Sequence, residues 1–142
     1  MKKDGLTGGM SGVRRRVLEI CEIVAPQTVS VEVMTNDPEE MLSQAREYAS
    51  WADNVIPKIT IHGPYGETEN LRIANELEMK HNIRVNVTAM MSAQQCLLAA
   101  FTGATYVSIF GGRVNNMGYN ACGEIRRLRT VLDKLGLRSK II

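Results

Sequence analysis

The regular alternation of strand-like and helix-like segments constrains the fold of this chain more than any other feature. Segments rich in β-branched or alternating apolar residues begin near residues 28, 55, 84, 105 and 139. Each of the first four is followed by a segment whose apolar residues have helical spacing. Strands that alternate with helices in this way are expected to be parallel and joined by crossover helices. The chain is therefore predicted to be an α/β protein.

The segment boundaries follow from the same patterns. Helices are predicted over residues 13–24, 38–49, 68–80, 92–101 and 121–135. The second of these has a clear start, because Pro38 stands in its first turn and Asp37 or Asn36 can cap it. Loops are predicted over residues 1–12 and 111–118.

Two architectures share this repeat of about 28 residues. Eight such units make about 220 residues, near the size of a (β/α)8 TIM barrel, whereas an open doubly wound sheet uses the same unit. A barrel places functional residues at the C-terminal ends of its strands. Glu32, Lys58, Thr88, Phe110 and Arg113 lie there, which favours the barrel. The 142 residues hold four units and one strand start. Residues 1–142 are therefore expected to be a single, partial TIM-barrel domain.

The charge balance limits the kinds of partner. Lys and Arg total 17 against 15 Asp and Glu, a net charge of +2, which excludes a polyanion binder that works by bulk charge. The compact basic cluster Arg14–Arg16 points in several directions on a helix and is read as a solvated helix face. No nucleic-acid partner is predicted.

No membrane segment or leader is predicted either. The 28 residues between Arg84 and Arg113 carry no charge, but polar residues interrupt them before about 18 apolar residues accumulate. No apolar stretch follows Met1–Gly5, as a signal peptide would require. The three cysteines form no CxxC pair and are read as core residues of a cytoplasmic protein.

Lys58 is the most informative single residue, because it lies in the strand Val55–Ile61 among apolar or β-branched neighbours. Burial lowers the pKa of a lysine toward that of a neutral, nucleophilic amine. Such an amine condenses with a ketone to a Schiff base, whose iminium stabilises an adjacent carbanion. An edge-strand lysine that reaches solvent is the alternative, and the local sequence leaves both open.

Glu32 is the only acid in its strand. Alternation puts Ser30, Glu32 and Met34 on one face and the valines on the other. If that face points into a barrel, the carboxylate lies near Lys58; a strand with a solvated polar face is the alternative.

The remaining candidates give weaker signals. Thr88 ends a strand, where its hydroxyl can position a water or a proton, although a structural threonine looks the same. Arg113 follows two glycines, which let an anionic group approach the backbone N–H groups while the guanidinium binds it. His62 and His81 lack metal-ligand spacing, and no P-loop or GxGxxG motif occurs, so no metal or cofactor is predicted.

Together these segments resemble the transaldolases and fructose-6-phosphate aldolases in their small single-domain form. The likeness covers barrel strands three to six with their helices and the start of strand seven. It is carried by the segments Val29–Val33, Asn54–Ile59, Asn82–Ala89, Ser92–Gln95, Ala99–Ser108 and Phe110–Val114.

The resemblance implies a role for each candidate. Lys58 would be the Schiff-base nucleophile, and Glu32 and Thr88 would hold a water that relays protons. Arg113 would bind the phosphate of a sugar, and the resemblance places Phe110, Asn86 and Ser108 at the substrate. Phe110 stands where the aldolase branch typically has tyrosine, which favours the transferase branch.

The implied reaction is the transfer of a dihydroxyacetone unit between sugar phosphates, without a cofactor. A lyase of the same superfamily and a non-catalytic sugar-phosphate-binding or scaffold fragment are the alternatives. The family implies a homo-oligomer, a pentamer or decamer.

Two departures from the family pattern stand out. The usual Lys-Ile-Pro-x-Thr reads Lys58–His62 here, with the proline moved to Pro57. Met1–Gly5 resembles a stretch that follows the family's second strand, and Lys140–Ile142 only begins the seventh. By resemblance, four of the eight strands are missing or unfinished.

Overall fold

Five parallel strands form one sheet in a computed structural model that describes residues 9–142. The strands are β1 (Val29–Glu32), β2 (Val55–Thr60), β3 (Asn86–Met90), β4 (Tyr106–Ile109) and β5 (Lys140–Ile141). They are neighbours in the order in which they occur in the chain. Because a doubly wound sheet reverses its order at a switch point, this continuous order is that of part of a (β/α)8 barrel.

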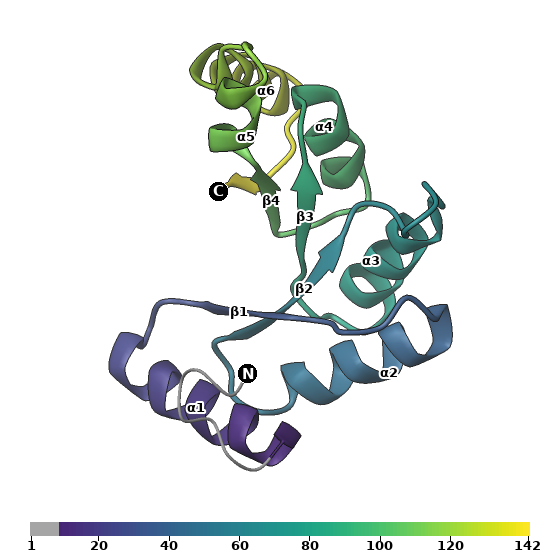
Figure 1. Cartoon of the computed structure of the whole chain (residues 1–142), viewed down its shortest axis with the longest axis vertical. Helices are drawn as coiled ribbons and strands as arrows, with labels where there is room; N and C mark the ends of the chain where they lie inside the picture. The colour runs from purple at the N-terminus through teal and green to yellow at the C-terminus, as the bar shows by residue number, and fades with distance from the viewer. Residues whose placement is uncertain (1–8) are drawn as a thin grey trace.

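The helices lie along one side of the curved sheet, as Figure 1 shows. They are α1 (Gly9–Val24), α2 (Pro38–Ala49), α3 (Glu69–Lys80), α4 (Ala93–Phe101), α5 (Gly111–Asn116) and α6 (Ala121–Lys134). Five of the six were predicted. The cap of α2 is Asp37, whose carboxylate accepts the Glu40 N–H at 2.9 Å.

Two loop predictions are wrong. Helix α1 begins at Gly9 inside the predicted loop, and its Met10 sulfur accepts a 3.9 Å hydrogen bond from the Tyr48 hydroxyl. Helix α5 replaces part of the loop over 111–118, because Val114 is buried in the core. In both places tertiary packing outweighs the poor helix propensity of glycine. Met1–Gly5, which was compared with a family segment, lies outside the described residues.

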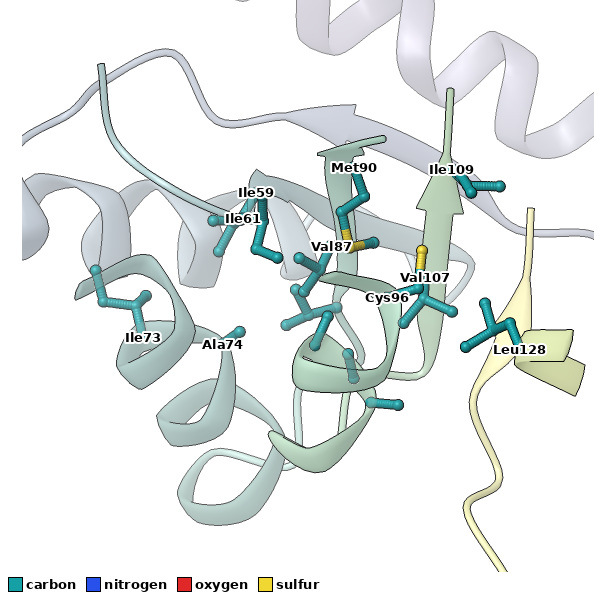
Figure 2. Close-up of a cluster of buried hydrophobic side chains, with 14 of the residues drawn as sticks. Ile59, Ile61, Ile73, Ala74, Val87, Met90, Cys96, Val107, Ile109 and Leu128 are labelled. Atoms are coloured by element: carbon teal, nitrogen blue, oxygen red, sulfur yellow. The ribbon is translucent and has the colours of Figure 1, made fainter. Parts of the chain in front are cut away.

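The outer face of the sheet forms the hydrophobic core against the helices. Figure 2 shows Ile59, Val87 and Val107 pointing at Ile73 of α3, Cys96 of α4 and Leu128 of α6. All of these side chains are buried. Since successive side chains of a strand alternate between faces, this packing leaves Lys58, Asn86 and Ser108 on the opposite, inner face.

Hydrogen bonds across the inner face show how strongly the sheet curls. The Thr28 hydroxyl, just before β1, donates to the Tyr106 hydroxyl of β4 at 3.2 Å. In a flat sheet these strands would lie three spacings apart, about 14 Å. The inner face is therefore concave, as in a barrel.

A β-bulge interrupts β3 immediately after Thr88. The register with β4 shifts between Val87 and Met90, and Ala89 has φ +63°. A positive φ is unfavourable for alanine, and bulges of this kind concentrate at the rims of barrels and next to active sites. The bulge lets both Val87 and Met90 face the helices.

Pro57 fits within β2 because of its place in the hydrogen-bond ladder. In a parallel strand, alternate residues direct their backbone groups to opposite neighbours. The Lys58 carbonyl accepts from Val33 after β1, and Ile61 donates to Thr88 of β3. Pro57 therefore faces β3, one residue before the β2–β3 pairing starts at Lys58 and Asn86. Its missing N–H costs no ladder bond.

The prediction that every cysteine fills a core position holds for two of three. Cys21 and Cys96 are buried, and burial raises the pKa of the Cys96 thiol to about 12. Cys122 is exposed on the first turn of α6, so the prediction is wrong for this residue. Arg14, Arg15 and Arg16 are exposed on α1, the solvated helix face that the sequence indicates.

Candidate active site on the inner face

Lys58 and Glu32 lie side by side on the inner face. Their strands pair so that Glu32 stands opposite Lys58, and the Lys58 Nζ is 3.7 Å from the Glu32 Oε2. The Lys58 side chain is 29% exposed to solvent, and the Glu32 side chain is 51% exposed. Because β2 lies between β1 and β3, the edge-strand alternative for Lys58 is wrong. The amine is half-buried next to a carboxylate, at the carboxyl-end half of its strand.

Asn86 stands next to Lys58 on the other side, and its amide is held at both ends. Lys58 pairs with Asn86 in the β2–β3 register. The Asn86 Nδ2 donates to the Ser30 Oγ at 3.0 Å, and its Oδ1 accepts from the Ser108 hydroxyl at 2.7 Å. With only 3% of its surface exposed, Asn86 ties β1, β3 and β4 together beside Lys58.

Among residues 9–142, Thr88 is the one strand-end residue of the inner face whose polar atom has no protein partner. Its side chain is 2% exposed, and its Oγ1 makes no hydrogen bond to any residue within 9–142. Thr60 of β2 is its register partner. A buried hydroxyl without a partner is costly, so this atom suits a bound water or substrate oxygen.

Replacing Thr88 by valine is expected to change the free energy of unfolding by less than about 0.5 kcal/mol, because valine keeps the shape and no residue within 9–142 loses a hydrogen bond. Thr60→Val is the matched control. The Thr60 hydroxyl donates to the His62 carbonyl at 2.9 Å and is bonded by Asn70 at 3.1 Å, so its loss is expected to destabilise by about 1 kcal/mol. Urea unfolding measures both; equal destabilisation by the two valines would contradict the assignment.

Phe110 and Arg113 form a second group at the end of β4. Phe110 precedes α5, and the Arg113 guanidinium carbon lies 4.4 Å from the centre of its ring. Stacking on an aromatic ring holds a guanidinium in one orientation. Arg113 is exposed, so its N–H groups can bind an anion at the mouth of the concave face.

The sequence missed the part that Ser30 plays. Alternation placed Ser30 on the face of Glu32, but nothing in its local sequence indicated a hydrogen bond to Asn86, 56 positions away. The predicted residues Asn86 and Ser108 form one hydrogen-bonded group with it, and the Glu32–Lys58 ion pair lies on the neighbouring positions of β1 and β2. Within residues 9–142, no group of three His, Cys, Asp or Glu side chains could hold a metal ion, and no helix is long and apolar enough to span a membrane.

Comparison with known proteins gives a consistent result. Residues 13–139 match the family described as transaldolase/fructose-6-phosphate aldolase. A probable transaldolase of Dehalococcoides mccartyi is 36% identical over 134 residues, which cover 94% of this chain and 59% of the relative. A probable transaldolase of Lactiplantibacillus plantarum is 38% identical over 146 residues, covering 98% and 64%. Probable transaldolase 2 of Listeria monocytogenes is 40% identical over 126 residues, covering 89% and 55%. The chain thus spans about three fifths of the length of these relatives.

Proposed function

Because the chain belongs to the transaldolase/fructose-6-phosphate aldolase family, we propose that Lys58 forms a Schiff base through which a dihydroxyacetone unit passes between sugar phosphates. The observation that carries the proposal is the half-buried Lys58 amine, 3.7 Å from the Glu32 carboxylate on the concave face. A carboxylate beside an amine can remove its proton and later return one, which imine formation requires.

The reaction follows from the chemistry of an iminium. The Lys58 amine adds to the ketose carbonyl, and loss of one water gives the iminium. The C3–C4 bond then breaks: its electron pair moves into an enamine on the lysine, and the C4 hydroxyl loses its proton as an aldehyde departs. Addition of the enamine carbon to a second aldose forms the new bond, and water releases the product from Lys58.

The neighbouring residues supply the proton transfers and hold the substrate. Glu32 and the unpartnered Thr88 hydroxyl hold a water that carries protons to and from the reacting atoms. Asn86 and Ser108, already bonded to each other, bind sugar hydroxyls. Arg113, stacked on Phe110, binds the phosphate.

The length of the chain relative to its relatives favours a second candidate function. The chain spans only 59% of the length of the Dehalococcoides relative. A chain that binds a sugar phosphate without chemistry is the second candidate. A lyase that releases free dihydroxyacetone is the third, and Phe110 argues against it. We further propose that residues 1–142 form one partial-barrel domain of a cytoplasmic homo-oligomer.

Trapping the imine tests the proposal. The chain is incubated with fructose 6-phosphate, reduced with borohydride, digested and mapped by mass spectrometry. A stable adduct on the peptide that contains Lys58 is expected, and addition of an aldose acceptor before reduction is expected to deplete it. Thermal stabilisation by the sugar without any adduct would instead establish the binding candidate. An adduct confined to another lysine would overturn the assignment.

A further inference from the structure

Thr60 is a polar residue of the inner face that the proposed function does not use. Its neighbours Ile59 and Ile61 are buried in the core between the sheet and the helices, where Figure 2 labels them. Because side chains alternate along a strand, Thr60 lies on the same face as Lys58, two residues further on at the carboxyl end of β2. The Lys-Ile-Pro-x-Thr pattern of the family has proline at this place, so the hydroxyl sets this chain apart from that pattern.

Two hydrogen bonds fix the orientation of the Thr60 hydroxyl. It donates its hydrogen to the His62 carbonyl oxygen at 2.9 Å, and its oxygen accepts from the Asn70 Nδ2 at 3.1 Å. Asn70 is itself held in place, because it is 4% exposed and also donates to the Thr60 carbonyl at 3.0 Å. A hydroxyl has one hydrogen and two lone pairs. With its hydrogen and one lone pair in use, the Thr60 hydroxyl can only accept one further hydrogen bond.

The Thr60 hydroxyl lies where a ligand on the inner face can reach it. Thr60 is half-buried, and its bond to His62 is in an exposed position. Its register partner is Thr88 of β3, which is 2% exposed and whose hydroxyl has no partner in the described part of the chain. Neighbouring strands lie about 4.8 Å apart, so the two threonines stand side by side, two residues beyond the Lys58–Asn86 pair. A ligand bound at Lys58 therefore meets two hydroxyls at the carboxyl ends of β2 and β3.

An acceptor that has no hydrogen left to donate selects for one kind of ligand group. A sugar hydroxyl can donate to it, whereas a carbonyl oxygen or a fully ionised phosphate offers only lone pairs and cannot. The phosphate has a cationic partner in Arg113 at the end of β4, two strands away from Thr60. A site that hydrogen-bonds a substrate hydroxyl discriminates against analogues that lack it. The position and the chemistry of Thr60 thus suit the hydroxyl-bearing carbon chain of the substrate.

We propose that Thr60 is a specificity-determining residue that accepts a hydrogen bond from a hydroxyl of the sugar bound at Lys58. The inference rests on the sugar-phosphate binding that is part of the proposed function, and it does not require the Schiff base.

Calorimetric titration of the full chain with fructose 6-phosphate tests the proposal, because it measures binding whether or not an imine forms. Thr60→Val is expected to raise the Kd about fivefold, the usual effect of losing one neutral hydrogen bond. Thr60→Ser keeps the hydroxyl and is expected to bind within about twofold of the wild type. Thr102→Val is the matched control, because the Thr102 hydroxyl also donates to a backbone carbonyl, that of Ala99 at 2.7 Å, but at the end of α4. It is expected to bind the sugar like the wild type.

Circular dichroism verifies that each variant is folded at the temperature of the titration, and Thr60→Ala replaces Thr60→Val if that variant unfolds. Undiminished affinity in Thr60→Val, an equal loss in Thr60→Ser or Thr102→Val, or no binding by the wild type would overturn the proposal. Binding that Thr60→Val weakens, in a protein that gives no borohydride adduct, would support the proposal and overturn only the Schiff base.

Discussion

The Lys58→Arg variant is expected to form no borohydride-stable adduct with fructose 6-phosphate, a loss of roughly a thousandfold or more relative to the wild type. Arginine retains the positive charge that faces Glu32 at 3.7 Å, so the electrostatics and packing of the inner face change little. A guanidinium stays protonated in proteins and does not give an imine under these conditions. The substitution therefore removes the nucleophile without removing the ion pair.

Lys140→Arg is the matched control for this prediction. Lys140 pairs with Tyr106 in the β4–β5 register, so it lies on the same face of the sheet as Lys58, and its Nζ lies 5.9 Å from the Tyr106 ring centre. Its replacement is expected to leave the adduct yield unchanged. An equal adduct in Lys58→Arg, or a loss confined to Lys140→Arg, would show that the reactive amine has been misassigned.

Leu77→Ala is expected to lower the free energy of unfolding by about 3 kcal/mol, which is the typical cost of removing a fully buried leucine side chain. Leu77 is 0% exposed and belongs to the core between α3 and the outer face of the sheet. Its truncation leaves a cavity among side chains from both layers, and the packed strands around it cannot collapse to fill the space. Urea denaturation followed by circular dichroism measures the loss.

The control lies two residues further along the same helix. Met79 is 70% exposed, and methionine and leucine have similar helix propensities, so Met79→Ala is expected to change stability by less than about 0.5 kcal/mol. A loss at Met79 as large as that at Leu77 would mean that the burial assigned to the two faces of α3 is incorrect.

Local sequence patterns were sufficient to predict most elements. The alternation in Val29–Glu32 and the cap at Asp37 were visible because strand faces and helix starts are set by residues only two to four positions apart. The same alternation correctly put Glu32 and Ser30 on one face. Helix α5 and the start of α1 were missed, because their stability comes from contacts with residues distant in the chain.

The sequence predicted which residues belong to the candidate site, but it did not predict how they are arranged in space. Lys58 was singled out because a lysine within an apolar strand is unusual, and Thr88 because it ends a strand. Whether Lys58 lay at an edge or at the centre of the sheet depended on which strands flank β2. The bulge at Ala89 was not predicted either, because an apolar Met90 at a position that alternation assigns to the polar face does not by itself identify a bulge.

The sequence by itself determined the repeating βα unit, the polarity of each strand face and the residues capable of chemistry, because periodicity and residue type act locally. Only the tertiary structure decided that the strands follow one another without a switch point and that the sheet curls. That curvature brings Ser30 to Asn86 across an intervening strand and makes the inner face concave. From the sequence, the βα repeat was compatible with two architectures, a barrel and a doubly wound sheet. The order and pairing of the strands identify it as part of a barrel, and both depend on contacts between distant residues.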